Sequence, residues 1–334
     1  MGDSFRRAAL VMGYQVFFFD CYDGWRGNRI SRSLSWRLND KRPLRLKDFM
    51  DNVLRVCEDA RPETVITTGT APLTAAALQA LRRQGIICIN YSTDDPWNPT
   101  QTANWFLRAL PHYDLILTTR RTNASDFRRI GCGEVRYLPF GYDEWLFRPS
   151  ARPFEGPAPD VLFVGGADHD RVAFMTDFLP AGPRVALVGE YWERYPTMRH
   201  HALGHHNVEA VCALTVAAKV NLCLVRRANR DGHVMRSFEI AALGGCMLAE
   251  DTTEHREIFG PDRETVVYFR SAREAAERTR LLLADPAERA RLSAAVRARI
   301  SHGAHTYRDR LVSILEAATR IRRPHSEPGQ SVGQ

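Results

Sequence analysis

The chain has 334 residues, 44% of them hydrophobic and 25% charged, which is the balance of a globular protein long enough for two domains. Its net charge of +7 raises the question of nucleic-acid binding, but 43 of the 46 basic residues are arginines spread along both halves of the chain. This distribution argues against a specific nucleic-acid partner, and leaves open an attraction to phosphorylated ligands or to an anionic membrane surface.

The seven cysteines are widely spaced and include no Cys-x-x-Cys pair. This usage is typical of free thiols in a reducing compartment rather than of a disulfide or zinc framework. The apolar runs are far shorter than the roughly 20 residues that span a bilayer, and no charged and then apolar leader opens the chain. We therefore expect a cytoplasmic protein.

In the first half of the chain, short apolar runs rich in β-formers alternate with helical patterns. The expected strands are 14–20, 64–68, 86–91 and 115–119, and the expected helices are 46–60, 72–83, 102–110 and 123–130. Such alternation predicts a parallel sheet covered on both faces. A doubly wound domain begins with a strand, whereas residues 1–5 look like the turn that follows one, so either the first strand is missing or translation starts upstream.

A proline-rich stretch at 150–160 is the best domain boundary, because a fresh strand follows it. Beyond it we expect strands at 161–164, 185–188, 220–225, 246–249 and 265–269, and helices at 171–178, 208–218, 234–243 and 272–284, with two more helices to about 322. The predicted fold class is α/β, with two Rossmann-like doubly wound domains facing a cleft. Residues 1–150 form the N-terminal domain and 151–322 the C-terminal domain, whose last helix can pack back on the first; 323–334 form a disordered tail.

Ligands of open parallel sheets bind outside the carboxyl ends of the strands. After the strand at 220–225, a basic loop with Arg230 and Gly232 runs into a helix that carries Arg236 and Glu239. Free amides and the positive end of the dipole at a helix start favour a diphosphate, and arginines add charged hydrogen bonds. The alternative for Glu239 is an intrahelical ion pair with Arg236, three residues earlier.

This segment resembles the donor-binding motif of retaining glycosyltransferases with two Rossmann domains, the GT-B fold, and most closely the CgeB-like branch with its Arg-x-Phe-Glu helix. The motif of the wider family is a Glu, seven residues and a second Glu. The second Glu matches Glu239, for which the resemblance implies hydrogen bonds to the ribose hydroxyls. The first position is occupied by the shorter Asp231, for which it implies contact with the donor sugar.

Two further segments extend the resemblance. Residues 137–143 (YLPFGYD), followed by Phe147-Arg148-Pro149, resemble the family's interdomain signature. Residues 163–166 (FVGG) resemble the first strand and turn of the donor domain, so Gly165 and Gly166 are expected beside the donor. A basic residue beyond this turn often meets the diphosphate in the family, which makes Arg171 a further candidate.

An acidic pair, Asp94 and Asp95, follows the strand at 86–91 in the first domain. A carboxylate there can accept the proton of an acceptor hydroxyl, and both are candidate catalytic residues with Asp231. The alternative is an Asp-Pro turn that caps a helix. The turn at 67–70 (TTGT) also follows a strand and either lines the site or caps the next helix.

The expected activity is transfer of a hexosyl-type group from a nucleoside diphosphate sugar to a hydroxyl acceptor. The resemblance implies retention of configuration. Arginines and helix amides would stabilise the leaving diphosphate, so we expect no cofactor and no metal. The histidines at 200–206 suggest a zinc site, but their surroundings complete no ligand set. Two alternatives remain, a nucleotide-sugar epimerase and a nucleotide-sugar-binding or assembly protein without catalysis.

Overall fold

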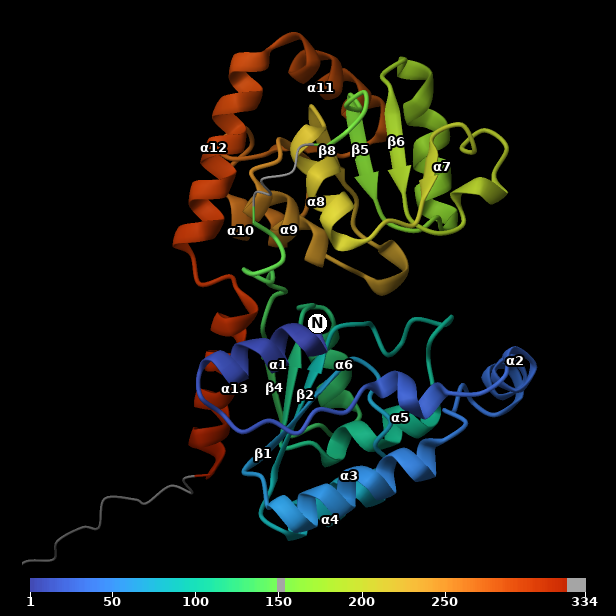
Figure 1. Cartoon of the computed structure of the whole chain (residues 1–334), viewed down its shortest axis with the longest axis vertical. Helices are drawn as coiled ribbons and strands as arrows, with labels where there is room; N and C mark the ends of the chain where they lie inside the picture. Colours follow the sequence, from blue (N-terminus) through green and yellow to red (C-terminus); the bar gives the residue numbers. More distant parts are fainter. Residues whose placement is uncertain (149–153, 323–334) are drawn as a thin grey trace, which may run out of the picture. The chain divides into compact units, whose positions relative to one another are not determined.

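The computed structural model describes residues 1–148 and 154–322, and these form two compact units (Figure 1). Unit 1 contains Met1–Pro139 and the described residues from Arg308 onwards, and unit 2 contains Phe140–Tyr307. The division lies before the predicted boundary at 150, because Tyr142 pairs with Thr306 in a β-bridge and this draws the segment after Pro139 into unit 2. Part of the proline-rich stretch and the predicted tail at 323–334 lie outside the described residues.

Unit 1 is built on a sheet of four parallel strands in the order β1-β2-β3-β4. The strands are β1 (Thr64–Thr68), β2 (Ile87–Ser92), β3 (Leu115–Thr118) and β4 (Glu134–Tyr137). The helices are α1 (Gly2–Val11), α2 (Arg29–Leu38), α3 (Leu46–Ala60), α4 (Ala75–Arg83), α5 (Asn104–Ala109), α6 (Asn123–Arg129) and α13 (Tyr307–Arg322), with 3₁₀ turns at Cys21–Trp25 and Leu110–His112. All residues of β2 and β3 are buried, as their continuous apolar runs predict.

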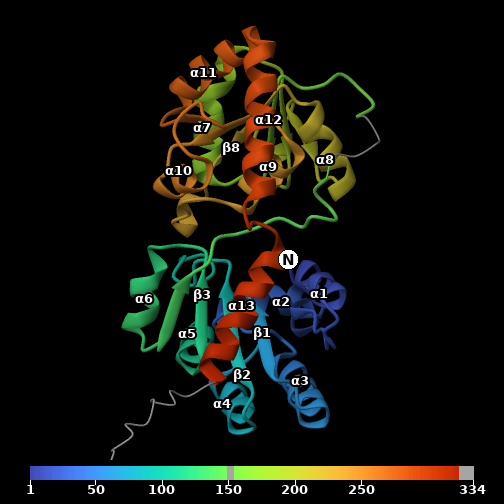
Figure 2. The same cartoon turned by 90° about the vertical axis from the view of Figure 1, so that its left-hand side faces the viewer.

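Helices cover both faces of this sheet. Helices α3 to α6 bury one face around a core that includes Phe49, Leu78 and Phe106. Figure 2 shows α13 crossing the other face, and Arg310 and Arg322 tie that helix to Pro139 and Glu63 of the same unit. The last helix of the chain therefore belongs to unit 1.

The predicted strand at 14–20 is wrong. This segment has no regular secondary structure, and its Tyr14, Phe17 and Phe18 are exposed. A strand needs a hydrogen-bonded neighbour, whereas β1 is an edge of the sheet and pairs with β2 alone among the described strands. Only Phe19 reaches the core, where its ring packs edge-on against Phe49.

Unit 2 is built on six parallel strands in the order β10-β9-β8-β5-β6-β7. They are β5 (Val161–Val164), β6 (Val185–Val188), β7 (Ala202–Gly204), β8 (Val220–Cys223), β9 (Met247–Glu250) and β10 (Val267–Phe269). The helices are α7 (His169–Phe178), α8 (Val208–Ala217), α9 (Met235–Leu243), α10 (Thr253–Phe259), α11 (Ala272–Ala284) and α12 (Pro286–His302), with 3₁₀ turns at Leu179–Ala181, Trp192–Arg194 and Arg227–Asn229. Helices α7 and α11 pack on one face and α8 on the other, so the unit is doubly wound.

The strand order of unit 2 reverses between β5 and β8. The chain first winds outward from β5 through β6 to β7, then returns to β8 on the other side of β5 and continues to β10. Loops on either side of such a reversal diverge and leave a crevice at the carboxyl ends of the two strands. The loop after β5 and the loop after β8 therefore flank the expected ligand site of this unit.

In the segment that resembles the interdomain signature, Gly141 lies close to the backbone of another segment of unit 2. Tyr142 N donates to the carbonyl of His305 at 3.1 Å, and Tyr307 N donates back to Tyr142 at 2.9 Å. A Cβ on Gly141 would lie 2.6 Å from the carbonyl oxygen of His305. Any other residue at position 141 would push these two segments of unit 2 apart.

Within the described ranges, no helix combines the length and the apolar character that crossing a membrane requires. All seven cysteines are free thiols, and six of them are buried.

Candidate functional site

The predicted donor residues of unit 2 lie on the two loops that flank the reversal of strand order and on the helices α7 and α9 that follow them. Gly165, Gly166 and Arg171 follow β5, whereas Arg230, Gly232, Arg236 and Glu239 follow β8. Asp168 connects the two loops, since its carboxylate lies 3.5 Å from Arg171 Nη1 and 4.0 Å from Arg226 Nε. Residues about sixty positions apart in the sequence thus meet at the carboxyl ends of neighbouring strands.

Arg171 and Arg226 form the cationic part of this site. Their Nε atoms are both buried and meet no acceptor among the described residues, whereas Arg171 Nη1 donates to the carbonyl of Gly166 at 3.1 Å. Burial and the charge of Arg226 lower the pKa of Arg171, and Asp168 opposes this shift. Asp231 also acts electrostatically on Arg171, so the two guanidinium groups meet two carboxylates. What the cluster offers an anion is therefore its two buried Nε donors.

Glu239 lies on α9 and is 3% exposed. Arg236 Nη1 lies 2.7 Å from its Oε2, which is the intrahelical ion pair that the spacing suggested. The two atoms are not aligned for a hydrogen bond, however, and each remains without a hydrogen-bond partner among the described residues. Burial raises the pKa of Glu239, and Arg236 opposes the shift. The carboxylate is therefore buried beside a cation with unused capacity to accept hydrogen bonds.

A chain of buried hydrogen bonds fixes the first turn of α9. His255 Nδ1 donates to the carbonyl of Glu250 at 2.8 Å, which leaves its Nε2 to accept from Ser237 Oγ, also at 2.8 Å. Ser237 Oγ in turn accepts from Val234 N at 3.3 Å. Burial lowers the pKa of His255 to about 4, so the imidazole is neutral at physiological pH and keeps this arrangement.

Two of the predicted glycines have structural reasons of their own. A Cβ on Gly232 would collide with the carboxylate of Glu254 at 2.1 Å, so this glycine makes room for Glu254 whether or not a ligand approaches. A Cβ on Gly165 would lie 3.0 Å from the ring of Phe163 and 3.4 Å from Arg171 Nη1. Gly165 thus allows Arg171 to reach back over the turn.

Unit 1 has its own pocket, of about 670 Å³, at the carboxyl ends of β1 and β2. We call it the α2 pocket. The strand ends contribute Thr68, Gly69, Thr70, Thr93 and Asp94, and the segment before α3 contributes Cys21, Tyr22, Trp25, Arg29, Arg32, Ser33, Trp36 and Lys41. The predicted turn at 67–70 therefore lines a pocket, and it caps no helix because α4 begins after Thr74.

The acidic pair of unit 1 is divided by the fold. Asp94 lines the α2 pocket, and its carboxylate forms no ion pair among the described residues. Asp95 is 1% exposed, and its Oδ1 accepts from Trp97 N at 3.0 Å and from Asn123 Nδ2 at 2.7 Å. Asp95 thus forms the turn that is the alternative to a catalytic role, while Asp94 lines the pocket.

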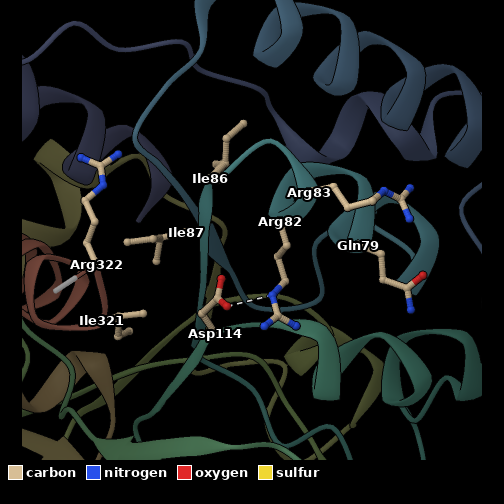
Figure 3. A pocket seen from close by; sticks show the side chains of 9 residues that line it. Gln79, Arg82, Arg83, Ile86, Ile87, Asp114, Ile321 and Arg322 are labelled. Atoms are coloured by element: carbon tan, nitrogen blue, oxygen red, sulfur yellow. Dashed lines mark ion pairs between the residues drawn. The ribbon is translucent and has the colours of Figure 1, made fainter. Parts of the chain in front are cut away.

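A second pocket of unit 1, of about 570 Å³, lies at the opposite ends of the strands (Figure 3). It is lined by Gln79, Arg82 and Arg83 of α4, by Ile87 at the start of β2, and by Asp114 just before β3. Figure 3 shows Arg82 paired with Asp114. Arg82 Nε lies 2.8 Å from Asp114 Oδ1, and Asp114 Oδ2 also accepts from Cys88 N. Asp114 thereby joins α4 to the amino ends of the strands, away from the edge at which ligands of parallel sheets bind.

The central residues of the histidine-rich segment at 200–206 form β7, and His201 Nδ1 donates to the carbonyl of Val185. Within residues 1–148 and 154–322, no three His, Cys, Asp or Glu side chains are grouped so that they could hold a metal ion.

The sequence pattern missed several residues of these sites. Asp168 caps α7 by accepting a hydrogen bond from Arg171 N. An Asp three residues before Arg171, at the start of a helical pattern, is the sequence signal that could have predicted this cap. The aromatic and basic residues of the α2 pocket, between Cys21 and Lys41, had no signal of their own. They belong to a stretch without strand alternation, and only the tertiary structure brings it to the ends of β1 and β2.

The two units together form the GT-B fold. The structure superposes on sucrose-phosphate synthase from Thermosynechococcus elongatus with a TM-score of 0.64 and 16% identity, over 83% of this chain and 78% of that one. For a UDP-forming α,α-trehalose-phosphate synthase from Burkholderia xenovorans the TM-score is 0.62 and the identity 13%, over 91% and 86% of the two chains. At such identities the likeness establishes the fold alone.

Residues 171–316 match a family described as glycosyl transferase-like. The matched segment begins at Arg171 and includes the loop after β8 and all of α9, which are the parts of unit 2 that carry the donor candidates. No curated protein matches the chain. The family match covers less than half of the chain, and with the GT-B fold it supports a glycosyltransferase.

Proposed function

We propose that the protein transfers a glycosyl group from a nucleoside diphosphate sugar, held by unit 2, to a hydroxyl acceptor, and that it is related to the CgeB-like branch. The observation that carries this proposal is the meeting of Arg171 and Arg226 at Asp168, where the strand order reverses. Diphosphates bind at such positions in doubly wound sheets. The buried carboxylate of Glu239, on the helix that follows the second loop, suits the ribose hydroxyls.

In the proposed reaction, the bond between the anomeric carbon and the diphosphate oxygen breaks as the acceptor hydroxyl attacks. Arg171 and Arg226 would neutralise the charge that develops on the leaving diphosphate, with the free amides at the start of α9. This role requires no divalent cation. Asp231 would contact the donor sugar and Asp94 would accept the hydroxyl proton, and the resemblance favours retention of configuration.

The experiment is incubation of the full chain with a panel of nucleoside diphosphate sugars, with and without a broad set of hydroxyl acceptors. Release of free nucleoside diphosphate that depends on an acceptor supports the transferase. If the chain binds nucleotide but turns over no sugar in the panel, the transferase is contradicted and a nucleotide-sugar-binding protein without catalysis is supported. The product's anomeric configuration, read by NMR, decides between retention and inversion.

A nucleotide-sugar epimerase remains the second candidate because the fold admits it. The structure also superposes, with a TM-score of 0.52 and 11% identity, on a protein from Listeria monocytogenes assigned as a UDP-N-acetylglucosamine 2-epimerase, over 82% of this chain and 79% of that one. In the same panel, an altered sugar that is still attached to its nucleotide would favour the epimerase.

We also propose a peripheral contact with an anionic membrane through α2. Ile30, Leu34 and Leu38 repeat every four residues along this helix and are 80%, 58% and 77% exposed. The helix contains three arginines and no acidic residue. An exposed apolar ridge flanked by arginines suits the interface of a bilayer with anionic headgroups.

A further inference from the structure

The α2 pocket carries an unbalanced positive charge. Arg29, Arg32 and Lys41 line it together with a single carboxylate, that of Asp94. Arg29 and Arg32 form no ion pair or hydrogen bond with any described side chain. Lys41 Nζ donates to the carbonyl of Thr102 at 2.7 Å, which holds it in place and leaves two of its three N–H groups for another acceptor.

Aromatic side chains from the same segment as the arginines, residues 21–41, also line the pocket. Tyr22, Trp25 and Trp36 line it, and the rings of Trp25 and Trp36 lie 5.6 Å apart between centroids. Flat apolar rings beside polar groups suit a ligand that presents a ring face and polar edges, as a sugar or a cyclic polyol does.

The helix that supplies the arginines is fixed to the unit at its carboxyl end. Asp40, two residues after α2, accepts from Asn104 N at 3.0 Å and from Trp105 N at 2.9 Å, at the start of α5. Ser35, the buried residue of α2, donates to the carbonyl of Arg42 at 2.7 Å. The arginines are therefore held at the pocket rather than on a free arm.

We infer that the α2 pocket binds a hydroxyl acceptor that carries an anionic group, of the class of phosphate esters of sugars or polyols. Arg29, Arg32 and Lys41 bind the phosphate, the aromatic rings pack on the ring of the acceptor, and Asp94 lies beside a hydroxyl. This inference rests on the proposed function, since it names the acceptor of that reaction. Two sources share the chemistry, a soluble sugar phosphate and the headgroup of an inositol phospholipid.

The test is a binding titration without any donor, so that its result is independent of whether transfer occurs. Glucose 6-phosphate is compared with glucose and with inorganic phosphate, by tryptophan fluorescence and calorimetry. In a second arm, vesicles that contain phosphatidylglycerol are compared with vesicles that contain the same fraction of phosphatidylinositol, so that both surfaces carry the same charge. Each charged hydrogen bond contributes on the order of a tenfold change in affinity, so glucose 6-phosphate should bind about tenfold more tightly than glucose. If the lipid is the source, the phosphatidylinositol vesicles should bind more tightly than the phosphatidylglycerol vesicles.

Matched variants of α2 complete the design. Arg29→Ala and Arg32→Ala should each remove most of the preference for glucose 6-phosphate over glucose, whereas Arg37→Ala, on the same helix but outside the pocket, should keep it. Equal binding of glucose and glucose 6-phosphate with no response to phosphatidylinositol would overturn the inference. So would an equal loss in the Arg37 variant, which would show a general effect of charge. Titration of the full chain with a nucleoside diphosphate tests the donor site of unit 2 separately, so failure of one site can be distinguished from failure of the other.

Discussion

Arg236 Nη1 lies 2.7 Å from Glu239 Oε2 on α9, yet the carboxylate is buried and still has a free acceptor site. An ion pair that only stabilised the helix would be exposed, as the pair of Arg273 and Glu277 on α11 is. This arrangement suits the ribose contact that we propose for Glu239.

Glu239→Ala should weaken the binding of a nucleoside diphosphate by about 1 to 3 kcal/mol, because two hydroxyl hydrogen bonds to a carboxylate are lost. Isothermal calorimetry measures the affinity, and circular dichroism confirms the fold. The control is Glu277→Ala, which removes the exposed pair on α11 and should leave affinity unchanged. Unchanged affinity in a folded Glu239 variant would show that Glu239 does not bind the ribose hydroxyls.

The arginine cluster should recognise the phosphates and not the base. Arg171→Ala and Arg226→Ala are each expected to lower the affinity for a nucleoside diphosphate by about tenfold, with little effect on the nucleoside. Arg227→Ala is the matched control, because the neighbouring Arg227 pairs with Glu250 at 3.0 Å on the surface. If the nucleoside loses affinity as much as the diphosphate, the cluster does not read the phosphates.

The two acidic residues after β2 should respond differently to substitution. Asp95→Ala removes the buried acceptor of Trp97 N and Asn123 Nδ2 and should lower the free energy of unfolding by about 1 to 3 kcal/mol. Asp94→Asn should leave thermal stability unchanged and reduce the rate of transfer, about 100-fold if it accepts the hydroxyl proton. A destabilised Asp94 variant with normal turnover would reverse these roles.

His255 should make the stability of unit 2 depend on pH. Its pKa is about 4 in the folded protein and 6.5 in a free side chain. As the pH falls from 6.5 towards 4, the unfolded chain takes up a proton that the folded chain does not, so the free energy of unfolding falls, by up to about 3 kcal/mol from this group. The loss is complete only below the folded pKa.

The measurement is the midpoint of thermal unfolding across this pH range for the native chain and for His255→Gln, which cannot titrate. The variant should be less stable near neutral pH, because it disturbs the bond to Ser237, but should lose less stability on acidification. Parallel curves for the two proteins would show that the imidazole does not report the pH change.

The apolar ridge of α2 should support binding to anionic vesicles. Replacing Ile30, Leu34 and Leu38 together by Ser should reduce sedimentation with phosphatidylglycerol vesicles by about tenfold or more, because three exposed apolar side chains no longer enter the interface. Leu281→Ser, an exposed leucine of α11, is the control. Equal binding of the native chain to neutral and anionic vesicles would show that the arginines of α2 do not contribute to membrane binding.

Most of the fold could be predicted because the apolar runs of buried parallel strands are a local signal. The runs at β1, β5 and β6 gave the observed strands residue for residue, and α3 and α11 were equally clear. The segment at 14–20 failed for the opposite reason. Its residues suit a strand, but a strand depends on a neighbouring backbone that the local sequence does not specify.

The sequence by itself determined the alternation of elements and the basic loop that leads to Glu239, because both depend on residues close together in the chain. Only the tertiary structure decided which side chains meet. It joined Arg171 and Arg226 through Asp168, turned Asp95 inward and Asp94 towards the α2 pocket, and brought α2 to the ends of β1 and β2. Such contacts arise from strand order and from packing over long separations in sequence, and no local pattern encodes them.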